Sequence, residues 1–227
     1  MSKVSIVIPT YNHWDLTHQL LMDIYKYNNS VDEILIVDDG STEQDVTSGS
    51  QWWMASMLPQ LQYHRCDENM KFLRACNWGV AKATGDVIIL VSNDVRMQDD
   101  IVSLVRNVMR EDSKVVMGGV LYTESTGWNE FKGHKIFPYL EGWLLIFSKC
   151  AWNEIGGFDE LYAPNDFEDV DFSTKAISLG YTLVPLSSTK VRHIGSQTIG
   201  YNPAREKITI KNRKKFAEKW QVEYYDL

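Results

Sequence analysis

The sequence lacks long apolar runs and has few cysteines. None of its 227 residues belongs to an uninterrupted apolar stretch of about 18, the length that a membrane-spanning helix requires. The opening segment passes directly into a strand-like pattern, without the apolar region and cleavage site of a signal peptide. Cys66, Cys76 and Cys150 are odd in number and lack C-x-x-C spacing, so they indicate neither a disulfide framework nor a zinc site. We therefore expect a cytoplasmic protein without a transmembrane segment.

Positive charge is also scarce, with 23 Lys and Arg against 30 Asp and Glu and a net charge of −7 at pH 7. A nucleic-acid partner usually requires a basic face, so this balance argues against one. The stretch from Lys207 to Lys219 is a local exception with six basic residues. We interpret it as a solvated helix face, and the alternative is peripheral contact with phosphate or an anionic membrane surface.

Short apolar segments alternate with amphipathic ones in the first half of the chain. Apolar runs at Val4–Ile8, Ile34–Val37 and Val87–Val91 are separated by amphipathic stretches at Trp14–Tyr27 and Phe72–Ala83. This alternation predicts an α/β fold with a Rossmann-like, mostly parallel sheet flanked by helices. Ligands bind at the carboxyl ends of such strands, so the polar residues that follow each strand should share one edge.

The second half is less regular. A helix near Asp99–Arg110 and a strand near Val115–Leu121 are followed by aromatic segments interrupted by glycine, a pattern typical of hairpins and loops. Further on we expect a helix at Asp169–Leu179, a strand at Thr182–Pro185 and a last helix beginning near Pro203.

The chain shows no internal repeat, low-complexity tract or linker. Its length suits one globular domain that buries a full core. We therefore expect a single domain over residues 1–227, with a regular half at about 1–121 and a smaller, irregular half at about 122–227.

Carboxylates follow two of the expected strands. Asp38-Asp39-Gly40-Ser41 comes after the second strand and Asn93-Asp94 after the third. A carboxylate just beyond a parallel strand can reach a ligand over the sheet edge, and Gly40 permits a tight turn. Each motif by itself is also common turn chemistry. A ligand site is therefore indicated by the two motifs together.

A second acidic cluster contains Glu168, Asp169 and Asp171. Carboxylates this close repel one another, which raises the proton affinity of at least one and suits it to act as a base. The alternative is a set of acids favoured at a helix N-terminus by the helix dipole. That alternative does not explain why aromatic residues surround the cluster.

These sites belong to a longer series of motifs. In chain order the series is Val4 to Asn12, Val37 to Ser41, Asn69 to Gly79, Ala83 to Asp86, Asn93-Asp94, Gly156 to Glu160 and Glu168 to Phe172. Each motif is modest alone, but their ordered co-occurrence over nearly the whole chain is specific. On these residues the chain resembles the family 2 inverting glycosyltransferases of the GT-A fold.

The resemblance implies a nucleotide-diphospho-sugar donor, UDP-, dTDP- or GDP-linked, bound by the first half. Pro9, Tyr11 and Asn12 at the end of the first strand look like part of the nucleotide site. Asp39 resembles the residue that accepts a hydrogen bond from a base N–H. Asn93 resembles the middle residue of the D-x-D element, which meets the ribose.

The resemblance also implies a divalent cation, Mn²⁺ or Mg²⁺. Asp94 looks like the metal-ligating end of D-x-D, and it is the only carboxylate there because Ser92 and Asn93 stand where acids often occur. One carboxylate is enough when phosphates and water complete the coordination. His193 resembles a late metal or diphosphate ligand, with a purely structural histidine as the alternative. Lys71 and Arg74 are candidate phosphate contacts; Lys71 often corresponds to glycine in relatives and has a surface turn as its alternative.

In the second half, which the resemblance makes the acceptor-binding and catalytic-base half, Asp169 looks like the general base. Transfer of a hexose or deoxyhexose to an acceptor hydroxyl would then proceed with inversion. Trp143 and Asp166 are the expected acceptor contacts, and the acceptor would be a glycan, lipid-linked or protein-linked. A monomer and a homodimer both fit the sequence.

Two other functions compete with this one. A sugar nucleotidyltransferase would use a similar sheet, but it usually opens with a glycine-rich phosphate loop, which the residues after the first strand do not form. A degenerate glycan- or nucleotide-binding module is favoured only by Ser92 and Asn93. The presence of Asp39, Asp94 and Asp169 counts against it.

Overall fold

The computed structural model describes residues 2–42, 56–112, 114–122, 130–131, 134–135, 138–195 and 202–222. Its helices are α1 (Trp14–Tyr27), α3 (Phe72–Lys82), α4 (Ile101–Glu111), α5 (Lys149–Ile155), the short 3-10 helix η3 (Glu160–Tyr162), α6 (Glu168–Ser178) and α7 (Pro203–Trp220). Its strands are β1 (Val4–Thr10), β2 (Glu33–Asp38), β3 (Leu61–Arg65), β4 (Val87–Val91), β5 (Val95–Met97), β6 (Val115–Gly118), β7 (Leu121–Tyr122), β8 (Glu130–Phe131), β9 (His134–Lys135), β10 (Tyr139–Leu140), β11 (Leu144–Ser148), β12 (Thr182–Pro185) and β13 (Val191–His193).

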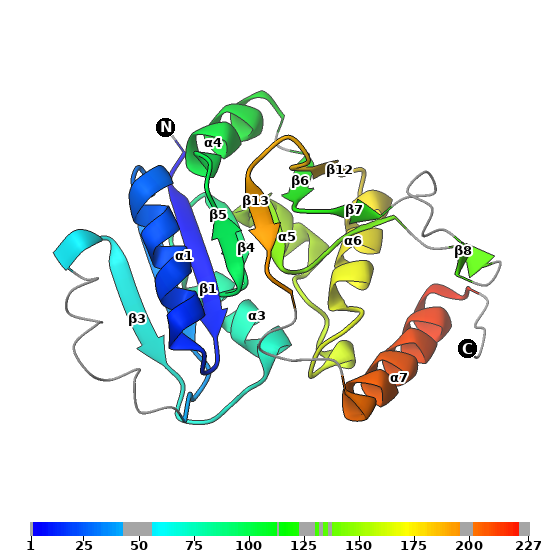
Figure 1. Ribbon diagram of the computed structural model, residues 1–227. Coiled ribbons are helices and arrows are strands. Elements are labelled where there is room, and N and C mark those ends of the chain that lie inside the picture. The colour runs from blue at the N-terminus through cyan, green and yellow to red at the C-terminus, as the bar shows by residue number, and fades with distance from the viewer. Residues whose placement is uncertain are drawn as a thin grey trace.

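A seven-stranded sheet in the order β12-β6-β11-β4-β1-β2-β3 forms the centre of the molecule (Figure 1). Neighbouring strands are parallel except at β11, which runs antiparallel to both β4 and β6. Every residue of β1, β2 and β4 is buried, as expected for strands covered on both faces. The predicted mostly parallel α/β sheet is confirmed.

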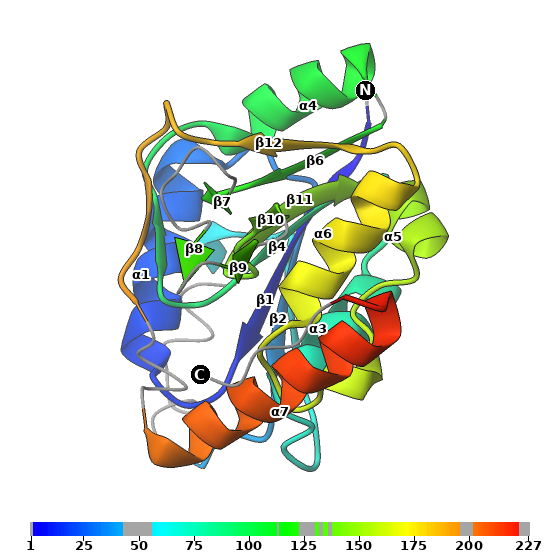
Figure 2. The same ribbon diagram turned by 90° about the vertical axis from the view of Figure 1, so that its right-hand side faces the viewer.

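Helices cover both faces of this sheet (Figure 2). Side chains of α1 and α4 pack with Ile6 and Leu144 in one core, and side chains of α3, α5, α6 and α7 pack with Val7 and Phe147 in the other. Neighbouring residues of one strand enter different cores because strand side chains alternate between faces. Each core thus draws on both predicted halves of the chain, while one domain over all 227 residues stays a prediction.

The strands β3, β5 and β13 and the helix α5 were not predicted. β3 reads Leu-Gln-Tyr-His-Arg and lies at the sheet edge, so it lacks the continuous apolar run of the inner strands. β5 and β13 have three residues each and pair antiparallel with one another outside the main sheet. α5, with seven residues, is too short to show a clear helical period.

α7 packs against the region of η3 and α6. Lys215 Nζ donates a hydrogen bond to the Leu161 carbonyl at 2.5 Å, and Lys219 Nζ lies 2.7 Å from Asp159 Oδ2. The interpretation of this stretch as a solvated face is therefore wrong for these two lysines, whereas Lys207 is exposed. None of the described helices is both long and apolar enough to cross a membrane.

Candidate active site

The candidate site lies at the carboxyl edge of β2, β1 and β4, which are adjacent and parallel. β11 begins at this same edge, because it runs antiparallel to β4 and its first residue, Leu144, pairs with Val91. The backbone N–H of Ser92 also donates to the Trp143 carbonyl at 2.9 Å. The topology thus places the residues before β11 beside those after β4.

Asp94 and His193 are brought together by the pairing of β5 with β13. His193 pairs with Val95, and the Ile194 N–H donates to the Asp94 carbonyl at 2.9 Å. His193 Nε2 lies 3.2 Å from Asp94 Oδ1. The Asp94 side chain is 5% exposed and that of His193 is 27% exposed, so the imidazole forms the accessible side of the pair.

The chemistry of this pair fits a divalent cation that shares its coordination with a substrate. A carboxylate oxygen and an imidazole nitrogen are suitable ligands for Mn²⁺. Within the described ranges no group of three or more His, Cys, Asp or Glu side chains gathers as a metal site. For a cation bound to this pair, phosphate oxygens and water would be suitable further ligands.

Trp143 is placed beside the Asp94–His193 pair. Its indole stacks on His193 with 5.2 Å between ring centroids and 13° between planes. Its Nε1–H donates to Glu141 Oε2 at 2.6 Å, and Glu141 Oε1 accepts from the Tyr122 hydroxyl at 3.2 Å. With 8% of its surface exposed, Trp143 supports the imidazole, and its expected contact with the acceptor stays a prediction. The supporting role of Glu141 was missed, because no spacing in the sequence indicates it.

Asp169 lies in the first turn of α6, close to the same segment. Its Oδ2 accepts from the Gly142 N–H at 2.9 Å and its Oδ1 from the Val170 N–H at 2.8 Å. Burial, together with the negative charges of Glu141 and Asp166, raises the pKa of Asp169 to about 6, although these two hydrogen bonds lower it. A carboxyl with this pKa is largely ionised at neutral pH and is still basic enough to take a proton.

The other two acids of this cluster behave differently from each other. Glu168 is buried, its Oε2 has no hydrogen-bond partner among the described residues, and burial together with Asp169 raises its pKa well above the ordinary value. Asp171 is fully buried but pairs with Lys175 at 3.1 Å and Lys219 at 2.7 Å. The prediction that all three acids repel one another is thus wrong for Asp171, because the ammonium groups of Lys175 on α6 and Lys219 on α7 offset its negative charge.

Asp39, the expected base-reading residue, is buried at the end of β2. Its Oδ1 accepts from the Met70 N–H at 2.6 Å and its Oδ2 from the Lys71 N–H at 2.8 Å. A carboxylate has about four acceptor positions, so a base N–H could still be accommodated. Lys71 adopts φ 73°, a conformation that favours glycine, and its side chain is exposed. This backbone conformation gives a physical reason for the glycine expected in relatives.

The β1 end is fixed to the loop after Asp39. The Asn12 N–H donates to Ser41 Oγ at 2.8 Å, and Asn12 Oδ1 accepts from the Thr42 N–H at 2.8 Å. Pro9 is a buried residue of β1, and Tyr11 directly after the strand is half-buried. These contacts brace the expected nucleotide site, and direct contact of the three predicted residues with a nucleotide stays a prediction.

Asn93 and Arg74 are engaged with protein groups. Asn93 Nδ2 donates to Thr10 Oγ1 at 3.1 Å and to Thr17 Oγ1 at 3.2 Å in the interior. Arg74 Nε donates to Glu160 Oε2 at 3.0 Å in an exposed ion pair. Their predicted contacts with ribose and phosphate stay predictions, since neither geometry directs them toward the Asp94–His193 pair.

Asp166 is also held by the protein, here by α7. Arg205 Nη2 donates to its Oδ1 at 2.8 Å, and the Thr209 hydroxyl donates to its Oδ2 at 2.7 Å. Burial would raise the pKa of Asp166, but these hydrogen bonds outweigh it and lower the pKa. The predicted role of Asp166 in acceptor binding stays a prediction.

Comparison with known proteins identifies the family. The sequence model described as Glycosyl transferase family 2 matches residues 5–171, so the chain belongs to that family. The chain is also similar to polypeptide N-acetylgalactosaminyltransferase 15 of Homo sapiens, with 24% identity over 221 residues that cover 83% of this chain and 34% of the human protein.

Solved structures show the same fold. The structure of GalNAc-T7 with UDP, GalNAc and Mn²⁺ superposes with a TM-score of 0.75 and 16% identity, covering 96% of this chain and 48% of that one. The mannosyltransferase PcManGT of Pyrobaculum calidifontis, in complex with GDP-Man and Mn²⁺, superposes with a TM-score of 0.72 and 19% identity. The match covers 99% of this chain and 66% of that one. The predicted GT-A fold is confirmed. The chain spans less than half the length of the human relative and of GalNAc-T7.

Proposed function

We propose that this chain is an inverting glycosyltransferase that moves a hexose or deoxyhexose from a nucleotide-diphospho-sugar to an acceptor hydroxyl. One observation carries the proposal: two consecutive residues link the candidate base to the candidate metal ligands. Gly142 donates its N–H to Asp169, and Trp143 stacks on His193, which pairs with Asp94. A base and a cation site this close can act on the two sides of one anomeric carbon.

Asp169 is the general base of the proposed reaction. In its ionised form it takes the proton of the acceptor hydroxyl while that oxygen attacks the anomeric carbon from the face opposite the diphosphate. The bond to the diphosphate breaks as the new glycosidic bond forms, and the configuration inverts. The pKa of about 6 supports this role because it makes the carboxylate more basic than an ordinary aspartate while leaving it mostly ionised at neutral pH.

The donor is held by the carboxyl edge of the sheet. Asp39 would accept a base N–H, and Asp94 and His193 would hold a divalent cation. When bound, Mn²⁺ or Mg²⁺ supplies positive charge that offsets the charge developing on the leaving diphosphate. Family membership and the Mn²⁺ with nucleotides named for GalNAc-T7 and PcManGT support this assignment.

The acceptor is a glycan, a lipid-linked molecule or a protein-linked one. The protein acts in the cytoplasm. It does so as a monomer or a homodimer. Nucleic acid is not expected as a partner at a net charge of −7. The exposed lysines Lys207, Lys211 and Lys214 on α7 give a surface for peripheral contact with an anionic membrane.

A thermal-shift panel tests the proposed donor site. UDP-glucose, UDP-N-acetylglucosamine, GDP-mannose and dTDP-rhamnose are each added with and without Mn²⁺, and a ligand of the folded state raises the melting temperature. Release of nucleoside diphosphate from the stabilising donor is then measured with Mn²⁺ and no acceptor. Slow release supports a glycosyltransferase; binding without release indicates a binding module, and release or consumption of pyrophosphate indicates a nucleotidyltransferase.

A further inference from the structure

The segment that leads into the candidate base is held by one buried side chain of α7. Asn212 is 1% exposed, and its Nδ2 donates to the carbonyls of Tyr162 at 2.7 Å, Asn165 at 2.9 Å and Asp166 at 2.9 Å. These carbonyls belong to the segment Phe158–Phe167, which runs through η3 to the start of α6. A single amide on α7 therefore fixes the path of the chain just before Asp169.

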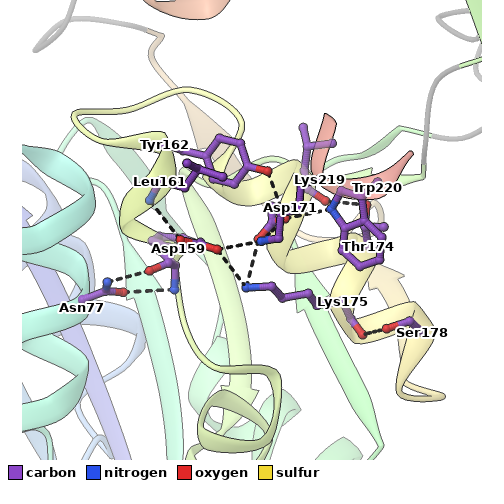
Figure 3. A network of polar contacts seen from close by, with 12 residues as sticks. Asn77, Asp159, Leu161, Tyr162, Asp171, Thr174, Lys175, Ser178, Lys219 and Trp220 are labelled. Atoms are coloured by element: carbon purple, nitrogen blue, oxygen red, sulfur yellow. Dashed lines mark hydrogen bonds and ion pairs between the residues drawn. The ribbon is translucent and has the colours of Figure 1, made fainter. Parts of the chain in front are cut away.

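A second anchor lies two residues after the base (Figure 3). Asp171 has no exposed surface, and its carboxylate lies 2.7 Å from Lys219 Nζ. Trp220 Nε1–H donates to its Oδ1 at 2.9 Å, and the Tyr162 hydroxyl donates to the same oxygen at 3.2 Å. The end of α7 is thus bound to the first turn of α6 by charge-assisted hydrogen bonds in a buried position, where they are strong.

The same lysine also reaches the start of the segment. Lys219 Nζ lies 2.7 Å from Asp159 Oδ2, so one ammonium group joins Asp159 to Asp171. On the other side, Asn77 of α3 exchanges two hydrogen bonds with the Phe158 backbone, at 2.8 and 3.1 Å. The segment is therefore held between α3 and α7.

The backbone immediately before α6 needs such support. Asp166 and Phe167 both have positive φ, 69° and 79°, a conformation that residues with a side chain rarely adopt. Strained backbone persists where the surrounding structure imposes it. Here the imposing groups come from α7: Asn212 binds the Asp166 carbonyl, and Arg205 binds the Asp166 carboxylate.

We infer that α7 is a clasp that positions the general base, with Asn212 and Lys219 as positioning residues for sugar transfer. The inference rests on the proposed function, in which Asp169 is that base. The family match ends at Asp171, so the α7 side of the clasp lies outside the matched region.

A clasp of this kind acts on the chemical step and spares donor binding. Asp39 and Asp94 follow strands β2 and β4, whereas the α7 contacts named above are to the segment that leads into Asp169 and to Asp171. A displacement of about 1 Å in a catalytic group can cost on the order of 100-fold in rate. Loosening the clasp should therefore lower kcat and leave the KM for the donor unchanged.

The test compares three lysine variants of α7 in the full chain. Lys219→Met removes the charge, Lys219→Arg retains it, and Lys211→Met is the control at an exposed lysine of the same helix. Donor turnover is followed as nucleoside diphosphate released from the nucleotide-sugar selected by the panel, with Mn²⁺. We expect Lys219→Met to lower kcat about 10-fold with the donor KM within about two-fold, and Lys219→Arg to recover most of the loss.

Trp220→Phe gives a milder variant in case Lys219→Met does not fold. It removes the Nε1–H donor to Asp171 while keeping an aromatic ring against Phe216. It should lower kcat without changing the donor KM. Parental kcat in the folded variants would overturn the clasp, as would a loss of rate matched by a loss of donor affinity.

Asp169→Asn, measured alongside, separates the two claims. Parental turnover by Asp169→Asn would mean that the proposed function has the wrong base. An inactive Asp169→Asn together with parental kcat in Lys219→Met and Trp220→Phe would overturn the clasp alone.

Discussion

The indole of Trp143 lies nearly parallel to the imidazole of His193, with 13° between the ring planes and 5.2 Å between their centroids. Asp94 Oδ1 lies 3.2 Å from the ring nitrogen Nε2 of the same imidazole. Because Glu141 accepts a hydrogen bond from the indole Nε1–H, the orientation of His193 depends on Trp143 and Glu141. Metal binding should therefore respond to changes at residues that are not themselves candidate ligands.

Trp143→Leu should weaken nucleotide binding in the presence of Mn²⁺ and leave binding without Mn²⁺ unchanged. An aromatic pair contributes about 0.5–1.5 kcal/mol, so the expected loss of affinity is about two-fold to ten-fold. Trp143→Phe keeps a stacked ring and should lose less. Calorimetric titration of UDP and GDP with and without Mn²⁺ measures the difference, and equal losses in both conditions would contradict the role.

Gly119→Ala should disturb the stacking of Trp143 on His193. A Cβ at this position would overlap the six-membered ring of the Trp143 indole, so the indole must shift. Overpacking of this kind costs about 1–3 kcal/mol of the free energy of unfolding. Chemical denaturation measures the cost. Combining Gly119→Ala with Trp143→Phe removes part of the overlapping ring and should recover stability, whereas simple additivity of the two changes would refute the contact.

Asp169→Asn should abolish sugar transfer and leave nucleotide affinity nearly unchanged, because the carboxylate acts on the acceptor side. General-base catalysis contributes about 100-fold to 10,000-fold, so a loss of at least about 100-fold is expected. Initial rates and nucleotide titrations, both with Mn²⁺, give the two quantities. A comparable fall in nucleotide affinity would place Asp169 in the donor site.

The pH dependence of kcat/KM should show an acidic limb near pH 6. Burial raises the pKa of Asp169 to about 6, so the base is protonated and inactive below this value and becomes active as the pH rises through it. Glu141→Gln removes a negative charge that raises this pKa, so its limb should move to lower pH. Rates measured between pH 5 and 8 test both points, and a profile identical to the parental one would exclude the influence of Glu141.

Asp94→Ala should remove the gain in nucleotide affinity that Mn²⁺ provides. Its carboxylate is the only one expected at the diphosphate, so no neighbouring acid replaces it. Glu111→Ala, at an exposed acid that ends α4, is the control and should keep the full gain. Retention of the Mn²⁺ effect in Asp94→Ala would assign the cation to other ligands.

Much of the fold follows from local sequence pattern. The runs that became β1, β2 and β4 are apolar on both faces, so they had to lie inside a covered sheet, and polar residues after them had to share an edge. Asp39, Asp94 and Asp169 were predicted as site residues in this way or through the family motifs. Strands of two or three residues, such as β5 and β13, carry too little pattern to predict.

Which atoms meet at that edge was decided only by the tertiary structure. His193 reaches Asp94 because β13 pairs with β5. Lys219 is half-buried because it forms ion pairs with the carboxylates of Asp159 and Asp171. A residue's type and spacing describe its own segment, whereas its charge, burial and orientation depend on segments that the fold brings beside it. The sequence therefore determined the layers and the candidate edge, and packing determined how the candidate base, the candidate metal ligands and α7 are joined.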